Sequence, residues 1–166
     1  VRDQCQYVLG KKYGVNVSFY NNVRKRSEEL WDNGKPVTVQ VWKIDGEKCP
    51  ETMLNAGTGK HVWYHYNRGE RWQEVSYVDG LKHGAETTYR NGGNELWNVE
   101  PWVKGQRKGT SIHYKFDGSR METTFGGKQD GMRVHYNQDG SIRNKFATLA
   151  DYQQHLTEET EKKYGK

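Results

Sequence analysis

Aliphatic residues are scarce in this sequence. Leu, Ile, Val and Phe together number 28 of 166 residues, and 28% of the chain is charged, a combination that is typical of disordered proteins. The aromatic residues argue against disorder, because 6 Trp, 11 Tyr and 4 Phe supply rings that can each bury about 150–250 Å². We therefore expect a folded chain whose core is thin and largely aromatic.

Long apolar runs, targeting signals and paired cysteine motifs are also lacking. No run of 18 apolar residues occurs, so no transmembrane segment is predicted. No signal peptide is visible, and the chain begins with Val1 rather than Met, which we interpret as removal of an N-terminal segment. The two cysteines, Cys5 and Cys49, have no CxxC context that would indicate zinc, and they allow one disulfide at most. A disulfide would favour an oxidising compartment, so we expect the bacterial periplasm or envelope, with the cytoplasm as the alternative.

Catalytic motifs are absent as well. No G-x-S-x-G, P-loop, HExxH or G-x-G-x-x-G pattern occurs, and nothing around Cys49 marks a nucleophile. We expect no enzyme activity, no catalytic residue, no metal and no cofactor. No RRM, OB or helix-turn-helix pattern indicates a nucleic-acid partner. The net charge of +5 permits an acidic protein or an anionic phospholipid surface as partner.

What the sequence does contain is an internal repeat. Two aromatic series run through it with one common period of 21 to 25 residues. The first series is Phe19, Trp42, Tyr66, Tyr89, Tyr114 and Tyr136, and the second is Trp31, Leu54, Tyr77, Trp102, Phe125 and Phe146. Alternating runs such as Val15, Val17 and Phe19 surround both series and are typical of strands. We expect about six β-hairpins in which both series face the core, because stacked hairpins bury what one hairpin alone cannot.

Glycines mark two turns in each period. Asp-Gly pairs at 45–46, 117–118 and 139–140 predict tight hairpin turns, because both positions tolerate positive φ. The segments 79–84, 104–109 and 126–131 begin or end with Gly and predict a wider second turn. Each repeat would therefore consist of a strand, a tight turn, a strand and a wide turn.

The whole chain is predicted to be one all-β domain, an elongated antiparallel array with a C-terminal helical cap. Residues 1–9 would form an N-terminal cap, 10–146 the hairpins and 147–166 a helix. The helix is indicated by the absence of Gly and Pro over 147–163 and by Thr148 followed by Asp151, which resembles a capping arrangement. Leu149, Tyr152 and Leu156 would form its narrow apolar stripe.

The order Gly-Lys-x-x-Gly, then Tyr, then Asn/Asp-x-Gly resembles the MORN-repeat-variant family. The match is clearest over 77–146, the segment Gly57-Thr58-Gly59-Lys60 also fits, and 10–56 match least. The resemblance to its YwqK-like, antitoxin-type members implies a non-enzymatic immunity protein that binds and blocks a cognate secreted toxin. The resemblance to ordinary MORN repeats implies the alternative, phospholipid binding or scaffolding. It implies no catalytic residues.

Candidate partner-binding residues are aromatic or basic side chains outside the expected core. They are Trp63, Trp72, Trp97, Arg68, Arg90, Lys115 and Arg133. Exposed Trp near Arg is typical of the centres of protein interfaces. For the Trp side chains, the alternative is a sheet that is covered on both faces, which would place them in the core. For the basic side chains, the alternative is an ordinary charged surface.

Three histidines stand one residue before a Tyr of the first series: His65, His113 and His135. Because strand side chains alternate, they should lie on the face opposite those rings. A metal site or a pH-sensitive contact is one interpretation. A solvated sheet face is the interpretation that we favour.

Overall fold

The computed structural model describes residues 3–127 and 130–164. The chain divides into two compact units, one of residues 1–96 and 102–106, the other of 97–101 and 107–166. Among the described residues, no helix has the length and apolar character needed to cross a membrane. The prediction of an all-β fold with a C-terminal helix is confirmed, because both units are built on antiparallel strands and α1 follows the last strand.

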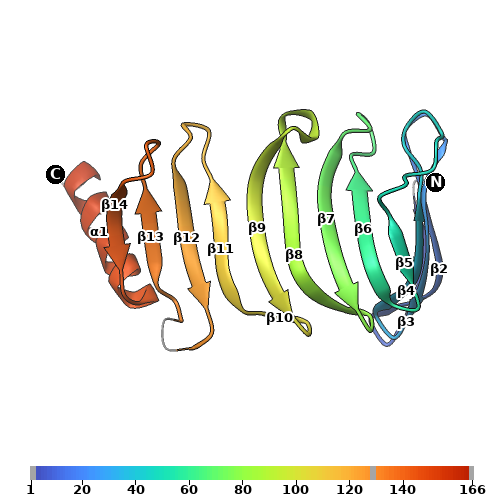
Figure 1. Cartoon of the computed structure of the whole chain (residues 1–166), viewed down its shortest axis with the longest axis horizontal. Helices are drawn as coiled ribbons and strands as arrows, with labels where there is room; N and C mark the ends of the chain where they lie inside the picture. The colour runs from blue at the N-terminus through green and yellow to red at the C-terminus, as the bar shows by residue number, and fades with distance from the viewer. Residues whose placement is uncertain (1–2, 128–129, 165–166) are drawn as a thin grey trace. The chain divides into compact units, whose positions relative to one another are not determined.

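The first unit contains strands that pair in chain order (Figure 1). They are β1 (Asp3–Val8), β2 (Lys11–Phe19), β3 (Lys25–Asp32), β4 (Lys35–Val41), β5 (Met53–Asn55), β6 (Thr58–Tyr64), β7 (Arg71–Val78) and β8 (Leu81–Arg90), followed by the short 3-10 helix η1 (Asn91–Gly93). The strand β9 (Glu95–Val103) contributes residues to both units, as does β10 (Gln106–Arg107). Residues 3–8 thus form a strand that pairs with β2.

Two of the tight turns of the first unit lie in segments that the sequence predicted to be wide turns, 79–84 and 104–109. Two residues with positive φ join β1 to β2, β3 to β4, β5 to β6, β7 to β8 and β9 to β10, and the second residue is always Gly. At 79–80, for example, φ is 52° for Asp79 and 71° for Gly80, as a type I′ turn requires. The segment predicted as a wide turn, 79–84, is therefore this two-residue turn followed by the start of β8, and Gly84 lies inside a strand.

The core of the first unit lies where the sheet curls back on itself. Arg26 of β3 donates from Nη1 to the backbone oxygen of Tyr64 on β6, at 3.5 Å, so these two strands face each other although two strands separate them along the sheet. The buried apolar side chains come from β4 to β7 and the segments beside them: Tyr20, Val39, Val41, Cys49, Leu54, Val62, Tyr64, Val75 and Tyr77. Leu54 and Tyr77 of the second aromatic series are thus core, as predicted, whereas Tyr66 of the first series is 37% exposed.

The second unit is a sheet followed by a helix. Part of β9 pairs with β11 (Gly109–Tyr114), and β12 (Arg120–Phe125), β13 (Arg133–Tyr136) and β14 (Ile142–Phe146) follow in chain order. The helix α1 (Leu149–Tyr164) ends the described chain. Thr148 and Asp151 form the predicted cap, because the amide of each donates to the side chain of the other, at 2.9 and 3.1 Å.

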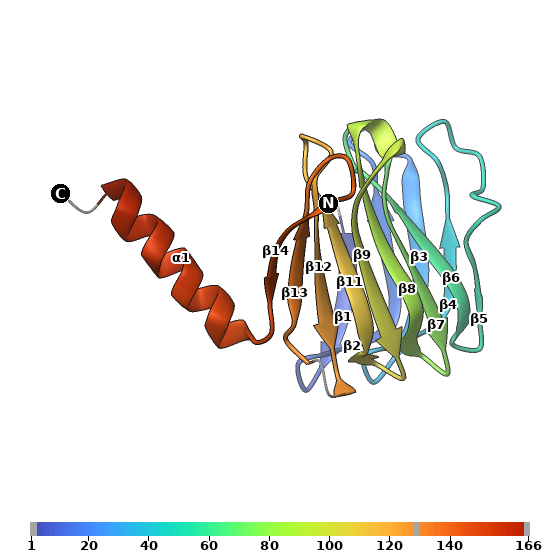
Figure 2. The same cartoon turned by 60° about the vertical axis from the view of Figure 1, so that its left-hand side comes forward.

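Only the first part of α1 packs against the sheet, and the helix then runs away from β14 (Figure 2). Tyr152 places its ring centroid 5.4 Å from that of Phe146 and 5.6 Å from that of His135. Leu149 and Leu156, which the apolar stripe also included, are 46% and 42% exposed. Tyr152, together with His155, whose ring centroid lies 5.0 Å from that of Phe146, therefore anchors the helix in place of the whole stripe.

The two aromatic series do not share a face, which corrects the expectation that both line one core. In the second unit, Tyr114 and Tyr136 both stand opposite Arg120, whereas Phe125 stands opposite Gly109. Phe125 is five residues from Arg120 on one strand, an odd number, so its side chain points to the other face. The same parity separates Trp42 from Leu54 in the first unit, where Val39 pairs with Leu54.

Candidate functional site

A cluster of polar side chains is buried inside the first unit, and we call it the Glu29 network. Its members are Asn16, Ser18, Ser27, Glu29, Trp31 and His61. The strands β2 and β3 supply most of them, because Asn16 pairs with Glu29 and Ser18 with Ser27 across the ladder. Val15, Val17 and Phe19 do share a face of β2, as the alternation predicts, but the buried residues of that strand, Asn16 and Ser18, alternate with them.

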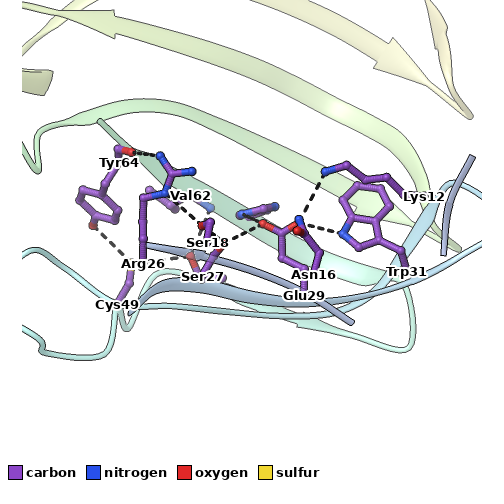
Figure 3. A network of polar contacts seen from close by, with 12 residues as sticks. Lys12, Asn16, Ser18, Arg26, Ser27, Glu29, Trp31, Cys49, Val62 and Tyr64 are labelled. Atoms are coloured by element: carbon purple, nitrogen blue, oxygen red, sulfur yellow. Dashed lines mark hydrogen bonds and ion pairs between the residues drawn. The ribbon is translucent and has the colours of Figure 1, made fainter. Parts of the chain in front are cut away.

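Glu29 is the centre of this network (Figure 3). Its carboxylate accepts hydrogen bonds from Asn16 Nδ2 at 3.2 Å, Ser27 Oγ at 2.9 Å and Trp31 Nε1 at 2.8 Å. Lys12 Nζ lies 4.0 Å away, and only 5% of the Glu29 side chain is exposed. Burial of a carboxylate reduces the stability of the fold by several kcal/mol unless hydrogen-bond donors surround it. These contacts offset that cost and fix the geometry of the site.

A chain of contacts continues from this centre toward Cys49. Ser18 Oγ lies 2.7 Å from Ser27 Oγ and accepts from Arg26 Nε at 3.1 Å. Beyond Arg26, the Tyr64 hydroxyl lies 3.3 Å from Cys49 Sγ. Burial raises the pKa of Tyr64 above the usual tyrosine range and that of Tyr20 to about 12, so both phenols stay neutral.

His61 is the most deeply buried titratable residue of this region, with 0% exposure. Its ring stacks on that of Trp63 at 3.4 Å between centroids, and Nε2 lies 3.7 Å from Glu29 Oε1. Burial lowers the pKa of His61 well below 6.5, and the charges of Lys12 and Arg26 lower it further. Within the described residues, neither ring nitrogen has a hydrogen-bond partner.

The sheet of the second unit carries a different kind of surface, which we call the tyrosine face and define as Ile112, Tyr114, Arg120, Glu122, Val134 and Tyr136. In strand register, Arg120 stands between Tyr114 and Tyr136, and Glu122 stands between Ile112 and Val134. All six side chains except the buried Val134 are half-buried. The rings are therefore held in place by neighbours and still reach solvent.

An equivalent cluster occurs in the first unit around Tyr89. Its hydroxyl donates to Glu74 at 2.9 Å, and the guanidinium of Arg71 lies 5.8 Å from the ring centroid. Arg71 also forms ion pairs with Glu74, at 3.8 Å, and with Glu51. An aromatic ring held by one Arg and one Glu is thus a recurring feature of this sheet.

The four predicted binding residues of the first unit are not one patch. Trp63 is half-buried against His61 and the core. Trp72 is 40% exposed at the start of β7. Arg68 is an exposed side chain that pairs with Glu70 at 3.3 Å, and Arg90, only 14% exposed, pairs with Glu95 at 3.2 Å. Trp72 and Arg68 remain candidates for contact, whereas Trp63 belongs to the interior.

The three predicted residues of the second unit also have different settings. Trp97 is 48% exposed, and its ring centroid lies 6.2 Å from that of His113. Lys115 is exposed at the end of β11. Arg133 lies under α1, with its guanidinium 4.3 Å from the Tyr152 ring centroid, so it serves the helix contact.

The cysteines and histidines complete the predicted candidates. Cys5 and Cys49 are both free thiols, so the disulfide considered from the sequence is not formed in this structure. His113 and His135 both stand opposite Met121 and so point away from the tyrosine face, as the alternation predicts. The pKa of His135 is lowered, first by burial and then by nearby cations. Over 3–127 and 130–164, no group of His, Cys, Asp and Glu is arranged to hold a metal ion.

Sequence reasoning missed the Glu29 network entirely. A signal was available, because Ser27, Glu29 and Trp31 are two residues apart in one strand and so share a face, as do Asn16, Ser18 and the Tyr20 that follows the strand before it. That phase places polar residues on the side of the large rings. His61 could not be added, because it is 32 positions from Glu29 and joins it only when the sheet curls.

No protein-family model matches the chain, and no curated protein matches it.

Proposed function

We propose that this protein is a non-enzymatic inhibitor of the immunity type, which binds a toxin-like partner protein through the tyrosine face and blocks it by occlusion. The observation that carries the proposal is Arg120 standing between Tyr114 and Tyr136 on a sheet that leaves them half-exposed. Tyr and Arg are enriched among the residues that dominate protein-binding energy.

Preorganisation supports the same proposal. The Tyr136 hydroxyl donates to Glu122 at 3.2 Å, and Arg120 Nε donates to the same residue at 3.0 Å. Both side chains also belong to strands, which move less than loops. A surface fixed before binding loses little side-chain entropy when a partner arrives, so few residues can supply a tight contact.

Affinity capture tests the proposal. The protein would serve as bait against lysate and secreted fractions of its source and of near relatives, with Arg120→Ala as a second bait. We expect a stoichiometric toxin-like protein that the wild type retains and Arg120→Ala loses, and whose activity the wild type inhibits.

Two outcomes would contradict the proposal. One is a captured protein that both baits retain equally and that keeps its activity when bound. The other is recovery of no protein together with salt-sensitive co-sedimentation on anionic liposomes, which would favour the phospholipid-binding alternative.

A further inference from the structure

The first unit has a cavity of about 210 Å³ that opens beside the Glu29 network. Its lining comes from β1, β2, β3 and β6, namely Cys5, Tyr7, Lys12, Asn16, Ser18, Arg26, Glu29 and Trp63. Tyr7 is 60% exposed and so stands at the solvent side, whereas Asn16, Ser18 and Glu29 are buried. The cavity is thus a polar recess with a closed floor and an aromatic wall.

The described residues that line this cavity carry two cations and one carboxylate. Lys12 and Arg26 are cationic and Glu29 supplies the carboxylate, while the nearby His61 is neutral because its pKa is depressed. Glu29 already accepts three hydrogen bonds from neighbouring side chains. The charge balance therefore favours a ligand with a single negative charge.

The floor also offers a polar atom that the protein does not satisfy. Within the described residues, Asn16 Oδ1 has no hydrogen-bond partner, although Asn16 lines the cavity and is only 7% exposed. Buried polar atoms are paired in the great majority of cases, so each unpaired one requires an explanation. A ligand that brings a hydroxyl donor would supply the missing partner for Asn16 Oδ1.

The wall of the cavity is aromatic. Trp63 lines it while stacking on His61, and Tyr7 lines it on the solvent side. Flat rings are favourable neighbours for a planar ligand, because stacked or edge-to-face contacts add to the burial of apolar area. The volume excludes a ligand of drug size, which needs about 300 Å³ or more.

We propose that this cavity binds a small planar hydroxycarboxylate, with its carboxylate at Lys12 and Arg26 and its hydroxyl toward Asn16. The site is distinct from the tyrosine face, so this proposal does not depend on the proposed protein partner. Lys12 is the cation to test, because it lines the cavity with a side chain that is 34% exposed, and its Nζ lies 4.6 Å from the Trp31 ring centroid and 4.0 Å from Glu29.

Titration calorimetry with 4-hydroxybenzoate tests the proposal on the full chain. The expected result is saturable binding of one molecule per chain. The uncharged 4-hydroxybenzamide should bind at least about tenfold more weakly, because a hydrogen bond to a charged group is lost. Benzoate, which lacks the hydroxyl donor, should bind about threefold to tenfold more weakly.

Two lysine variants locate the site. Lys12→Gln should weaken 4-hydroxybenzoate at least about tenfold. The matched control Lys11→Gln changes the adjacent, exposed residue of the same strand and should change affinity less than about twofold. Unchanged melting temperatures would show that both variants fold. The proposal is overturned if the wild type shows no saturable binding, if the amide binds as well as the acid, or if the two lysine variants behave alike.

Discussion

The guanidinium of Arg120 lies over the ring of Tyr136, with 4.0 Å between Cζ and the ring centroid. The two residues stand directly opposite each other on β12 and β13, and Glu122 accepts a hydrogen bond from both. A cation over an aromatic face is attracted by the ring quadrupole, so the pair orders itself without a partner. This ordering is what makes the tyrosine face suitable as a preformed contact surface.

Glu29→Gln should destabilise the first unit. The amide keeps the size of the side chain but removes the charge that Asn16, Ser27 and Trp31 donate to, and its own NH₂ group would face some of these donors. We expect a loss of about 2–4 kcal/mol in the free energy of unfolding, measured in urea. Glu28→Gln is the matched control, because the Glu28 side chain is 49% exposed and pairs with Lys25 at the surface, and it should cost at most about 0.5 kcal/mol. Equal losses in the two variants would show that the Glu29 network is not buried.

Stability should fall as the pH drops below the ordinary histidine pKa of about 6.5. In the folded state the pKa of His61 is lowered by burial and by the charges of Lys12 and Arg26. Below pH 6.5, His61 therefore binds a proton in the unfolded chain but not in the folded chain. The pKa of His135 is also lowered in the folded state, so this residue contributes to the loss of stability in the same direction. The free energy of unfolding is greatest above pH 6.5 and should decrease by up to about 1.4 kcal/mol per pH unit for each such group.

Urea unfolding at pH 7.5 and pH 5.5 measures this effect. His61→Gln cannot take up the proton, so its loss of stability between the two pH values should be clearly smaller than that of the wild type. An unchanged difference between the two pH values would mean that His61 titrates as an exposed histidine.

Gly59→Ala should be far more damaging than Gly46→Ala. Both glycines have positive φ, 134° for Gly59 and 97° for Gly46, so each alanine carries a backbone cost of about 1–2 kcal/mol. A Cβ at Gly59 would in addition overlap the backbone oxygen of Met53, whereas one at Gly46 meets nothing within 4 Å. We expect a total loss of about 2–5 kcal/mol for Gly59→Ala. Thermal melting of the two variants provides the comparison, and similar melting temperatures would contradict the close approach of β5 and β6.

Most of the fold could be predicted from the repeat period of the sequence. Alternation within runs such as Val62 to Tyr64, together with turn glycines at regular spacing, predicted antiparallel hairpins in chain order. Thr148 and Asp151 predicted the start of α1. The faces could not be obtained in this way, because they depend on the exact number of residues in each turn. Tyr114 and Phe125 are separated by a longer turn than Asp79 and Gly80 form, and one residue more or less moves a ring to the other face.

The candidate sites were less predictable than the fold. Exposed Trp72 and Trp97 were identified from their place outside the aromatic series, but Trp63 occupies the same kind of position and is interior. The difference arises from the curl of the first unit, which covers the second face of β6 with β3. Nothing local in the sequence of β6 encodes that curl, so the pairing of His61 with Glu29 becomes visible only in three dimensions.

The most direct test of the central claim compares two arginines of the second unit in calorimetry with the captured partner. Arg120 belongs to the tyrosine face, whereas Arg107 pairs with Glu100 at 3.0 Å and lies 5.6 Å from the ring centroid of Phe125, the aromatic residue of the opposite face. The proposed function predicts that Arg120→Ala weakens the partner at least about tenfold and that Arg107→Ala changes its affinity less than about threefold. Equal affinities of the two variants, or a larger loss for Arg107→Ala, would contradict the assignment of the tyrosine face as the binding surface.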